Sequence, residues 1–413
     1  MHTRALPVAL AATLVACSGP SAPSGEAPPP DGAATTWYRD VLPVAQEHCL
    51  GCHNDEAPTF SMERWSEDLA TRAPLIAQYT AAGIMPPWRP SPDCNRYHGE
   101  RLLDADAIAV FAAWAADDGA EGDPADAPPP LPPLAELERV DRHLTLETAY
   151  TPAPPTGDVN DLRCFVLDPE LGDDAMLVGF DVTPGERRVV HHVLLYSADS
   201  DELAALDAAD PGPGYGCPGG PGASSARVIA GWVPGMPANH YPEGTGVPLA
   251  KDERLVMQIH YNTAQAGPLP DQSAVDLMLA EAAVEAPAQI FSIADHDFSI
   301  PPQTHGHTTT VEVDVPAAGT LWAAAPHMHL LGRQARVEVE RANGDVACLV
   351  DIPSWSFDWQ QFYFLADPAG LPVAPGDTIR FSCTWDNDTP EAVTWGDGTE
   401  DEMCITYLYA TAK

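Results

Sequence analysis

From about residue 140 to the C-terminus, apolar and polar residues alternate one by one, and no long helical pattern interrupts them. Val311, Val313 and Val315 alternate with acidic residues, and 336–340 repeats the pattern before Asn343-Gly344, a pair typical of hairpin turns. Further strands are predicted at 164–168, 176–181, 189–196, 254–262 and 378–384. Because no helices separate these strands, they predict antiparallel sheets rather than βαβ units. About 270 residues are too many for one sandwich, so we expect two jelly-roll-like sandwiches, at 140–287 and 288–413.

The region 36–119 has a helical pattern instead. Asp104 is expected to cap a helix in which Ile108, Phe111 and Ala115 recur at helical spacing, and Gly119 is expected to end it. Residues 120–139 are acidic and then proline-rich, which is typical of a semi-rigid linker. The chain is therefore predicted to be multidomain, with a small all-α domain followed by two all-β domains.

The charge is strongly acidic, with 60 Asp and Glu against 20 Lys and Arg and a formal net charge of −40. Nucleic-acid binding requires clustered cations that neutralise phosphates, and this sequence has no such cluster. Basic patches that would bind an anionic membrane surface are missing for the same reason. We therefore expect no nucleic-acid partner.

The first 17 residues resemble a signal for export. The apolar stretch from Leu6 to Ala16 is too short to cross a bilayer, which takes about 20 residues, and small residues precede Cys17 as in a bacterial lipobox. Cys17 is therefore predicted to carry a lipid, with ordinary signal cleavage as the alternative, and 18–35 to be a flexible tether. We expect an exported protein of the bacterial cell envelope that contacts the membrane only through this lipid anchor.

The segment Cys49-Leu50-Gly51-Cys52-His53 is a CxxCH motif, which attaches c-type haem through two thiols and presents the histidine to the iron. A redox CxxC pair would need a βαβ context, and a zinc site would need a second pair of ligands nearby; both are missing. Met85, in Gly-Ile-Met-Pro-Pro-Trp, resembles the distal methionine of small class I cytochromes c and is our choice for the second axial ligand. Met62 and His98 are the alternatives. The region 36–119 is thus predicted to be a cytochrome c-like domain.

Histidines recur in the predicted strands. His191 and His192 are adjacent, His260 lies in another strand, and His327 and His329 form an HxH pair whose side chains share one face of a strand. Adjacent histidines face opposite ways, so His191 and His192 share a metal ion only where the strand is locally twisted. A histidine in a strand is more often packed than metal-bound, and the spacing alone leaves both interpretations open.

Five segments in order resemble the copper type II, ascorbate-dependent monooxygenases, the family of dopamine β-hydroxylase and the peptidylglycine α-hydroxylating enzyme. They are RRVVHHVLLY, LVMQIHYN, PHMHLLGR, SCTWDN and EDEMCITYLY, within residues 140–413. The resemblance implies an electron-transfer copper at His191, His192 and His260. It implies a second copper, which binds dioxygen beside the substrate, at His327, His329 and Met403, with Tyr407 on the substrate side.

The resemblance also implies disulfides between Cys383 and Cys404 and between Cys164 and Cys217. Cys94 and Cys348 remain as either a pair or two thiols. Two positions depart from the peptide-amidating enzyme: Ala325 stands where an arginine would hold the substrate carboxylate, and Ile405 where an asparagine would follow the methionine ligand. A peptide ending in glycine is therefore not the expected substrate. Asp401 and Glu402, directly before Met403, are expected to bias the copper cleft against anionic substrates.

We expect an oxidoreductase that contains two copper ions and one haem and hydroxylates a C–H bond of a small organic substrate with O2. Electrons would pass from ascorbate, a quinol pool or another cytochrome through the haem to the copper. The alternative is a non-catalytic haem–copper lipoprotein that relays electrons or holds copper in the envelope.

Overall fold

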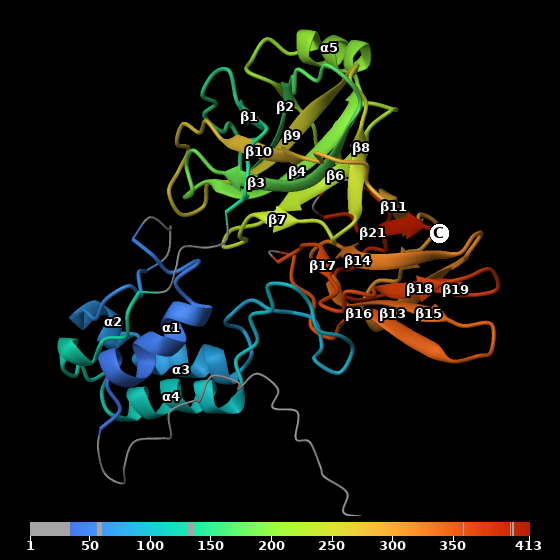
Figure 1. The fold of residues 1–413 in the computed structure, drawn as a ribbon. Helices are drawn as coiled ribbons and strands as arrows, with labels where there is room; N and C mark the ends of the chain where they lie inside the picture. The colour runs from blue at the N-terminus through green and yellow to red at the C-terminus, as the bar shows by residue number, and fades with distance from the viewer. Residues whose placement is uncertain (1–33, 56–59, 131–135, 358, 397, 399) are drawn as a thin grey trace, which may run out of the picture.

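The computed structural model describes residues 34–55, 60–130, 136–357, 359–396, 398 and 400–413, which form a helical unit and two β units (Figure 1). The predicted signal with Cys17, most of the tether 18–35, and 131–135 of the linker lie outside the described residues. The helical unit contains the π-helical turn η1 (Trp37–Val41), α1 (Leu42–His48), α2 (Glu67–Thr71), α3 (Ala73–Ala81), α4 (Ala105–Ala116) and the 3-10 turn η2 (Pro124–Asp126).

The helix α4 follows the prediction from its caps. The Asp104 carboxylate accepts a hydrogen bond from the Ala107 amide at 2.8 Å, which satisfies one of the amide groups at the start of the helix. Gly119 follows the helix with φ +69°, where a Cβ would lie 2.9 Å from Ala70. Phe111 and Trp114 project from α4 into a core that also contains Trp37, and all three are fully buried.

The first β unit consists of strands in two layers and one helix. Its elements are β1 (Arg142–Thr145), β2 (Asn160–Leu167), β3 (Ala175–Thr183), β4 (Val190–Asp199), α5 (Ser200–Ala209), β5 (Tyr215–Gly216), β6 (Arg227–Trp232), β7 (Asn239–His240), β8 (Thr245–Leu249), β9 (Glu253–Asn262) and β10 (Ala274–Leu279). One layer is a five-stranded sheet in the order β5-β2-β9-β4-β6, and the strands β1-β10-β3-β8 form the other. The predicted strands at 164–168, 176–181, 189–196 and 254–262 are confirmed. The helix α5 was not predicted.

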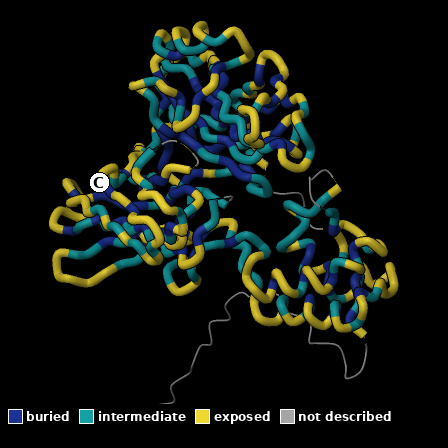
Figure 2. The backbone as a smooth tube through the Cα atoms, turned by 180° about the vertical axis from the view of Figure 1, so that it is seen from behind, coloured by how far each residue is buried: buried dark blue, intermediate teal, exposed yellow. Residues whose placement is uncertain are grey.

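The second β unit is also layered. Its strands are β11 (Ala286–Asp295), β12 (Ser299–Ile300), β13 (Thr304–Asp314), β14 (Gly319–His327), β15 (Gly332–Glu340), β16 (Val346–Ile352), β17 (Tyr363–Phe364), β18 (Leu371–Val373), β19 (Thr378–Asn387), β20 (Val393–Thr394) and β21 (Cys404–Ala412). The sheet β13-β19-β15-β16 faces the strands β11-β21-β14-β17. Asn343-Gly344 forms the predicted hairpin between β15 and β16, with Gly344 at φ +88°. Figure 2 shows that buried residues gather inside each unit and exposed residues lie mostly at its periphery.

The two β units are not separate sandwiches, which differs from the prediction. β8 of the first unit pairs in parallel with β11 of the second, through Thr245 with Ala286 and Gly246 with Pro287. This pairing joins the strands into one ten-stranded sheet that passes through both units. The two cores are also connected, because the Thr245 hydroxyl lies 2.7 Å from the Tyr409 hydroxyl.

A segment from the predicted helical domain packs on the second β unit. Residues 88–102 leave the helical unit after α3 and reach the strands β16 and β17 (Figure 1). The Ser91 amide donates to the Asp351 carbonyl at 2.7 Å, and the Tyr97 hydroxyl donates to the Leu349 carbonyl at 2.9 Å. Trp88 is buried in the core of the β unit beside Tyr363. The predicted domain 36–119 thus contains a stretch that belongs to the core of the second β unit.

Three disulfides are formed among the described cysteines. Cys164–Cys217 and Cys383–Cys404 match the pairs that the family resemblance implied. Cys94–Cys348, which the sequence left open, joins the segment 88–102 to β16. Disulfides persist in oxidising compartments, so they indicate an extracytoplasmic location.

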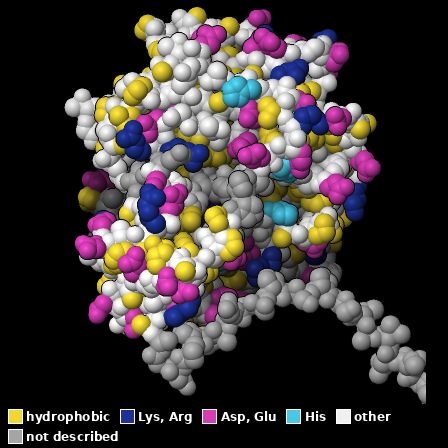
Figure 3. Space-filling model, turned by 60° about the vertical axis from the view of Figure 1, so that its left-hand side comes forward, with side chains coloured by type: hydrophobic (Ala, Val, Ile, Leu, Met, Phe, Trp, Pro, Cys, Tyr) yellow, Lys and Arg dark blue, Asp and Glu magenta, His cyan; other side chains and the backbone are white. Residues whose placement is uncertain are grey.

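The surface is acidic, as the composition requires. Figure 3 shows acidic side chains spread over one face rather than gathered into a single patch. Within the described ranges, no helix is long and apolar enough to cross a membrane.

Candidate metal centres

The first candidate centre joins the start of β4 to β9. His191 and His192 lie in β4, and His192 is the register partner of His260 in β9. The register shifts between Val190 and His192, so β4 carries an irregularity at this point. This irregularity is the local twist that two adjacent histidines need in order to face one ion.

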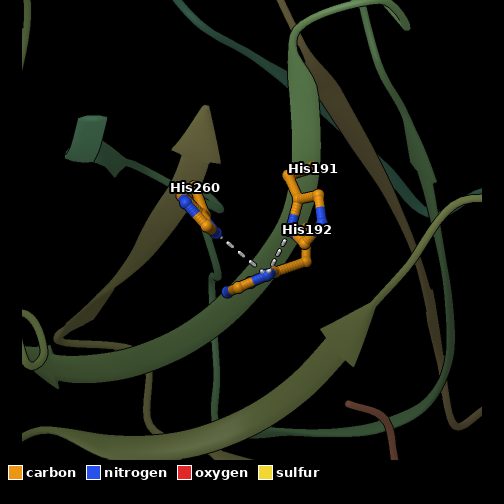
Figure 4. A group of neighbouring side chains, drawn as sticks. All are labelled: His191, His192 and His260. Atoms are coloured by element: carbon orange, nitrogen blue, oxygen red, sulfur yellow. Dashed lines mark hydrogen bonds between the residues drawn. The ribbon is translucent and has the colours of Figure 1, made fainter. Parts of the chain in front are cut away.

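The three imidazoles converge on one point (Figure 4). The Nδ1 atom of His192 lies 3.3 Å from Nδ1 of His191 and 3.4 Å from Nδ1 of His260, and the ligand atoms of all three residues lie within 4.8 Å of one another. The Asn160 side-chain oxygen lies 2.9 Å from Nε2 of His260, so Nε2–H donates and the Nδ1 lone pair of His260 is left for a metal. The prediction that these histidines come together is met by this geometry.

The electrostatics also suit a metal. Burial, and then the charge of neighbouring His191, lower the pKa of His260 to about 3. Burial and the charges of His260, His191 and His327 lower the pKa of His192 as well. The imidazoles of His192 and His260 are therefore neutral at pH 7, which is the form that binds metal. A set of three imidazole nitrogens fits copper in either oxidation state.

The second candidate centre lies at the end of β14. The rings of His327 and His329 are perpendicular, with centroids 5.2 Å apart. Nδ1 of His327 bonds to the Gln360 side-chain oxygen at 2.5 Å, and Nδ1 of His329 bonds to the Asp401 carbonyl at 3.0 Å. Both Nδ1 atoms are thereby occupied, which leaves Nε2 of each ring for a metal. Burial and the charge of His329 lower the pKa of His327 to about 4, so this ring is also neutral at pH 7.

Met403 is held near this pair by its neighbours. It is buried, directly precedes β21, and lies two residues before Ile405, which is the register partner of His327. The preceding residue, Glu402, accepts a hydrogen bond from the His329 amide at 2.9 Å. The Asp401 carbonyl and the Glu402 carboxylate therefore tie the methionine segment to the HxH segment.

Glu402 does not have the role expected from the sequence. Its carboxylate is fully buried and also accepts hydrogen bonds from the Leu331 amide at 2.6 Å and the Trp385 indole at 2.9 Å. The oxygens of this carboxylate point at their N–H donors inside the protein and not at the solvent. The expected bias against anionic substrates is therefore left to Asp401, which is exposed.

Tyr407 lies between the two β units. It is the register partner of Ala325, two residues before His327, and it packs against the cluster that contains Tyr196 and Phe362. Burial raises the pKa of Tyr407, so its hydroxyl stays protonated at neutral pH. Its role on the substrate side remains a prediction.

The CxxCH motif follows α1 in a tight turn. The His53 amide donates to the Cys49 carbonyl at 2.8 Å, and Nδ1 of His53 lies 3.0 Å from the Phe60 carbonyl oxygen. This bond sets the tautomer and leaves Nε2 of His53 for a metal. Burial raises the pKa of the Cys49 thiol to about 12, and the three disulfides use neither Cys49 nor Cys52. These residues fit the attachment of a haem.

The candidates for the second haem ligand lie in different places. Met85 is half-buried after α3, where its amide bonds to the Tyr79 carbonyl. Met62 is buried in the helical core, and its amide donates to the His53 carbonyl at 2.8 Å. His98 is exposed on the second β unit, where its amide donates to the Phe364 carbonyl. The assignment of Met85 remains a prediction.

A cavity of about 390 Å³ is lined by residues of both the CxxCH motif and the three-histidine centre. Gly51 and Cys52 line it together with His191 and Trp232. Trp359, from the second β unit, completes the junction of all three units.

Three contributing residues were not found from the sequence. Asn160 orients His260, which lies 100 residues away in the sequence, and Gln360 orients His327, which lies 33 residues away. Glu402 holds the HxH segment through the backbone amide of His329. Amides and carboxylates of this kind are common in loops, so no local pattern distinguishes them.

One region of the chain, which contains the residues of the second candidate centre, matches a known protein family. Residues 287–411 match the C-terminal domain of the copper type II ascorbate-dependent monooxygenases. The matched residues include His327, His329, Met403 and Tyr407, and they leave the CxxCH motif outside.

Several relatives share a larger part of the chain. Tyramine beta-hydroxylase of Caenorhabditis briggsae is 26% identical over 315 residues, which cover 69% of this chain and 51% of that protein. DBH-like monooxygenase protein 1 of Homo sapiens is 27% identical over 252 residues, covering 54% of this chain and 39% of that protein. Dopamine beta-hydroxylase of Canis lupus familiaris is 26% identical over 199 residues, which cover 44% of this chain and 32% of that protein. The chain thus spans about half the length of these relatives, or less.

Solved structures resemble the chain only weakly. The major capsid protein P2 of bacteriophage PM2 aligns with a TM-score of 0.28 and 9% identity, covering 65% of this chain and 96% of that chain. A likeness of this size says nothing about function.

Proposed function

We propose that the chain is a member of the copper type II ascorbate-dependent monooxygenase family and hydroxylates a C–H bond of an organic substrate with O2, because residues 287–411 match the C-terminal domain of that family and its relatives are 26–27% identical to larger parts of the chain. One oxygen atom would enter the substrate and the other would leave as water, with two electrons and two protons consumed. The observation that carries the proposal is the convergence of His191, His192 and His260 in a chain whose residues 287–411 match the family.

The two centres would have different tasks. Two copper ions would supply the two electrons, one from each ion. His191, His192 and His260 offer three nitrogens to the first ion, a set that suits both oxidation states.

His327 and His329 offer Nε2 atoms to the second ion, and the soft thioether of Met403 favours the reduced form. Gln360 and the Asp401 carbonyl hold these two rings in place. Tyr407, with its hydroxyl protonated, would face the substrate. Ala325 in the place of a carboxylate-binding arginine argues against peptide-glycine substrates.

The CxxCH motif would bring electrons to the copper. Cys49 and Cys52 would form thioethers to a haem, His53 would bind its iron through Nε2, and Met85 would be the second ligand. An ascorbate-type donor, a quinol or another cytochrome would reduce this haem. The attachment residues and the cavity between Cys52 and His191 support this assignment.

The protein would work outside the cytoplasm. Three disulfides support an oxidising compartment, and a lipid on Cys17 would hold the chain to a membrane of the bacterial envelope. Cys17 lies outside the described residues, so this part rests on the lipobox-like sequence alone.

Metal content tests the proposal first. Purified protein should contain two copper ions and one covalent haem per chain, measured by metal analysis and by the haem spectrum in denaturant. Zero or one copper would contradict the two-centre proposal.

Met403→Ala tests the division of tasks. It should abolish substrate-dependent O2 consumption while the three-histidine copper and the haem remain. Met176→Leu is the matched control, since Met176 is a half-buried methionine of β3 outside both centres, and it should leave O2 consumption unchanged. Copper at both centres with no O2 consumption on any organic substrate would favour the electron-relay alternative.

A further inference from the structure

We propose that electrons enter the copper protein where Cys52 touches the turn Pro234-Gly235, and that they reach the three-histidine centre through β6. The inference rests on the proposed function, since it assigns a route to the haem that the CxxCH motif would attach. The transfer itself balances as one electron, with ferrous haem oxidised to ferric and Cu(II) reduced to Cu(I).

The contact at the start of the route is tight. The Cys52 sulfur lies 3.7 Å from the Pro234 carbonyl oxygen, and a Cβ added to Gly235 would lie 2.6 Å from the same sulfur. Gly235 also has φ +79°, a conformation that favours glycine. The turn therefore approaches the sulfur as closely as it does because residue 235 has no side chain.

The chain continues directly from this contact to the copper ligands. Two peptide bonds lead from Pro234 through Val233 to Trp232 at the end of β6. Trp232 is the register partner of Val193 in β4, and Val193 is bonded to His192. The path consists of covalent bonds, one sulfur–backbone contact and one strand pairing, so it crosses little empty space.

The approach of the motif to this turn is held in place. The disulfide Cys94–Cys348 and the hydrogen bond from the Asn95 side chain to the Cys348 carbonyl at 2.7 Å fix the segment 88–102 on the second β unit. Arg101, at the end of this segment, interacts with the Cys52 thiol and bonds to the Gln361 side chain at 3.2 Å. The contact is therefore preorganised rather than dependent on a flexible linker.

A cavity lies beside the contact. Both Cys52 and His191 line it, so a group bonded to the Cys52 sulfur has space next to the three-histidine centre. Arg187 and Arg188 also line the cavity, and the Arg188 guanidinium is paired with the Glu186 carboxylate at 2.6 Å.

A second route starts from the same sulfur. Arg101 leads to Gln361, and its chain neighbour Gln360 bonds to His327 of the other centre. This route crosses two side-chain hydrogen bonds and flexible side chains, whereas the route through Pro234 follows the backbone. We therefore assign the entrance to the Pro234-Gly235 turn.

The test uses the full-length protein with its haem reduced and its copper removed, with excess reductant washed out. Mixing it anaerobically with Cu(II) should oxidise the haem, followed by its absorbance, at a rate independent of protein concentration. Gly235→Ala should slow this step by roughly tenfold or more, because the added methyl group pushes the turn away from the sulfur. The haem spectrum and the copper stoichiometry should stay as in the wild type.

A matched variant controls for the substitution itself. Gly157→Ala imposes a similar backbone strain, at φ +93°, with no atom within 4 Å. It should transfer the electron at the wild-type rate.

Three results would overturn the assignment. Gly235→Ala that transfers at the wild-type rate, or a Gly157→Ala control slowed as much as Gly235→Ala, would show that the turn is not the route. A rate lowered by Gln361→Ala and not by Gly235→Ala would move the route to His327. Each leaves the monooxygenase proposal standing, because copper content and O2 consumption with an external reductant are measured separately. If Gly235→Ala does not fold, the test uses Pro234→Ala instead. This substitution loosens the same turn and should also slow electron transfer.

Discussion

Replacing Glu402 is expected to weaken the fold and the second copper centre together. Its carboxylate accepts hydrogen bonds from the amides of His329, Leu331 and Met403 and from the Trp385 indole, at 2.9, 2.6, 3.3 and 2.9 Å. No part of the side chain reaches solvent. Glu402→Ala therefore leaves four buried N–H groups without their acceptor, two of them on proposed copper ligands.

The size of the effect follows from these four donors. A buried donor without a partner costs roughly 1–3 kcal/mol, so Glu402→Ala should lower the free energy of unfolding by roughly 4–12 kcal/mol. Glu402→Gln keeps the shape, and its oxygen can replace the carboxylate oxygen that accepts three of the four bonds. Its NH2 group then faces the Leu331 amide, and this one unsatisfied donor should cost roughly 1–3 kcal/mol. Alanine should thus be the worse replacement, by several kcal/mol out of a typical total of about 5–15 kcal/mol.

Urea unfolding followed by tryptophan fluorescence measures the stability of each variant. Copper titration of each protein measures the second effect, because a displaced His329 amide moves the imidazole that bonds to the Asp401 carbonyl. Glu402→Gln should bind copper more weakly at the His327 centre by about 10–100-fold and keep the affinity of the three-histidine centre.

The control is Glu312→Ala, which removes an exposed carboxylate on β13 that pairs with Arg380 at the surface. It should change the free energy of unfolding by no more than about 0.5 kcal/mol. The reasoning would be refuted by a Glu402→Ala protein that unfolds at the wild-type urea concentration and binds two copper ions with wild-type affinity.

Three further outcomes are expected. Asn160→Ala should weaken copper binding at the three-histidine centre by about 10–100-fold, measured by titration, and an unchanged affinity would mean that the tautomer is set elsewhere. Hydrogen bonds from Arg163, and then from a backbone amide, lower the pKa of Asp210 to about 2, below its ordinary 3.8. This contribution to stability is present at neutral pH and is lost as the pH falls from about 4 to about 2. In Asp210→Asn, the midpoint of urea unfolding should therefore change less with pH over that range than in the wild type. Joint replacement of Cys94 and Cys348 by serine opens a loop of 254 residues. It should cost about 5 kcal/mol on the chain-entropy estimate, whereas an unchanged thermal midpoint would mean that the segment 88–102 is held by packing alone.

The strands were predictable because their pattern is local. Val311 and Val313 alternate with acidic residues, and Asn343-Gly344 marks a turn, so β13 and the β15–β16 hairpin follow from a period of two. The pairing of Thr245 with Ala286 has no such pattern, because backbone pairing between distant strands leaves no trace in either segment. The single ten-stranded sheet was therefore not predicted.

The residues of the candidate centres also fall into those that a local pattern predicts and those that depend on the fold. The HxH pair can be recognised in the sequence because residues i and i+2 of a strand share a face. The CxxCH motif can be recognised because haem attachment requires two thiols and a histidine at this spacing. The side chains of Asn160 and Gln360 come from distant segments, and their contribution depends on the fold. The docking of 88–102 on the β unit was missed because a proline-rich segment after a helix has the same composition whether it is a loop or part of a core.

The pairing of β8 with β11 has a consequence for any attempt to divide the protein. A cut between the two β units would leave each fragment with an open sheet edge, at Thr245 and Gly246 on one side and at Ala286 and Pro287 on the other. Unpaired edges offer their amides and carbonyls to other chains and promote aggregation. Each half, expressed alone, should therefore precipitate or associate, and co-expression of the two halves should restore soluble protein.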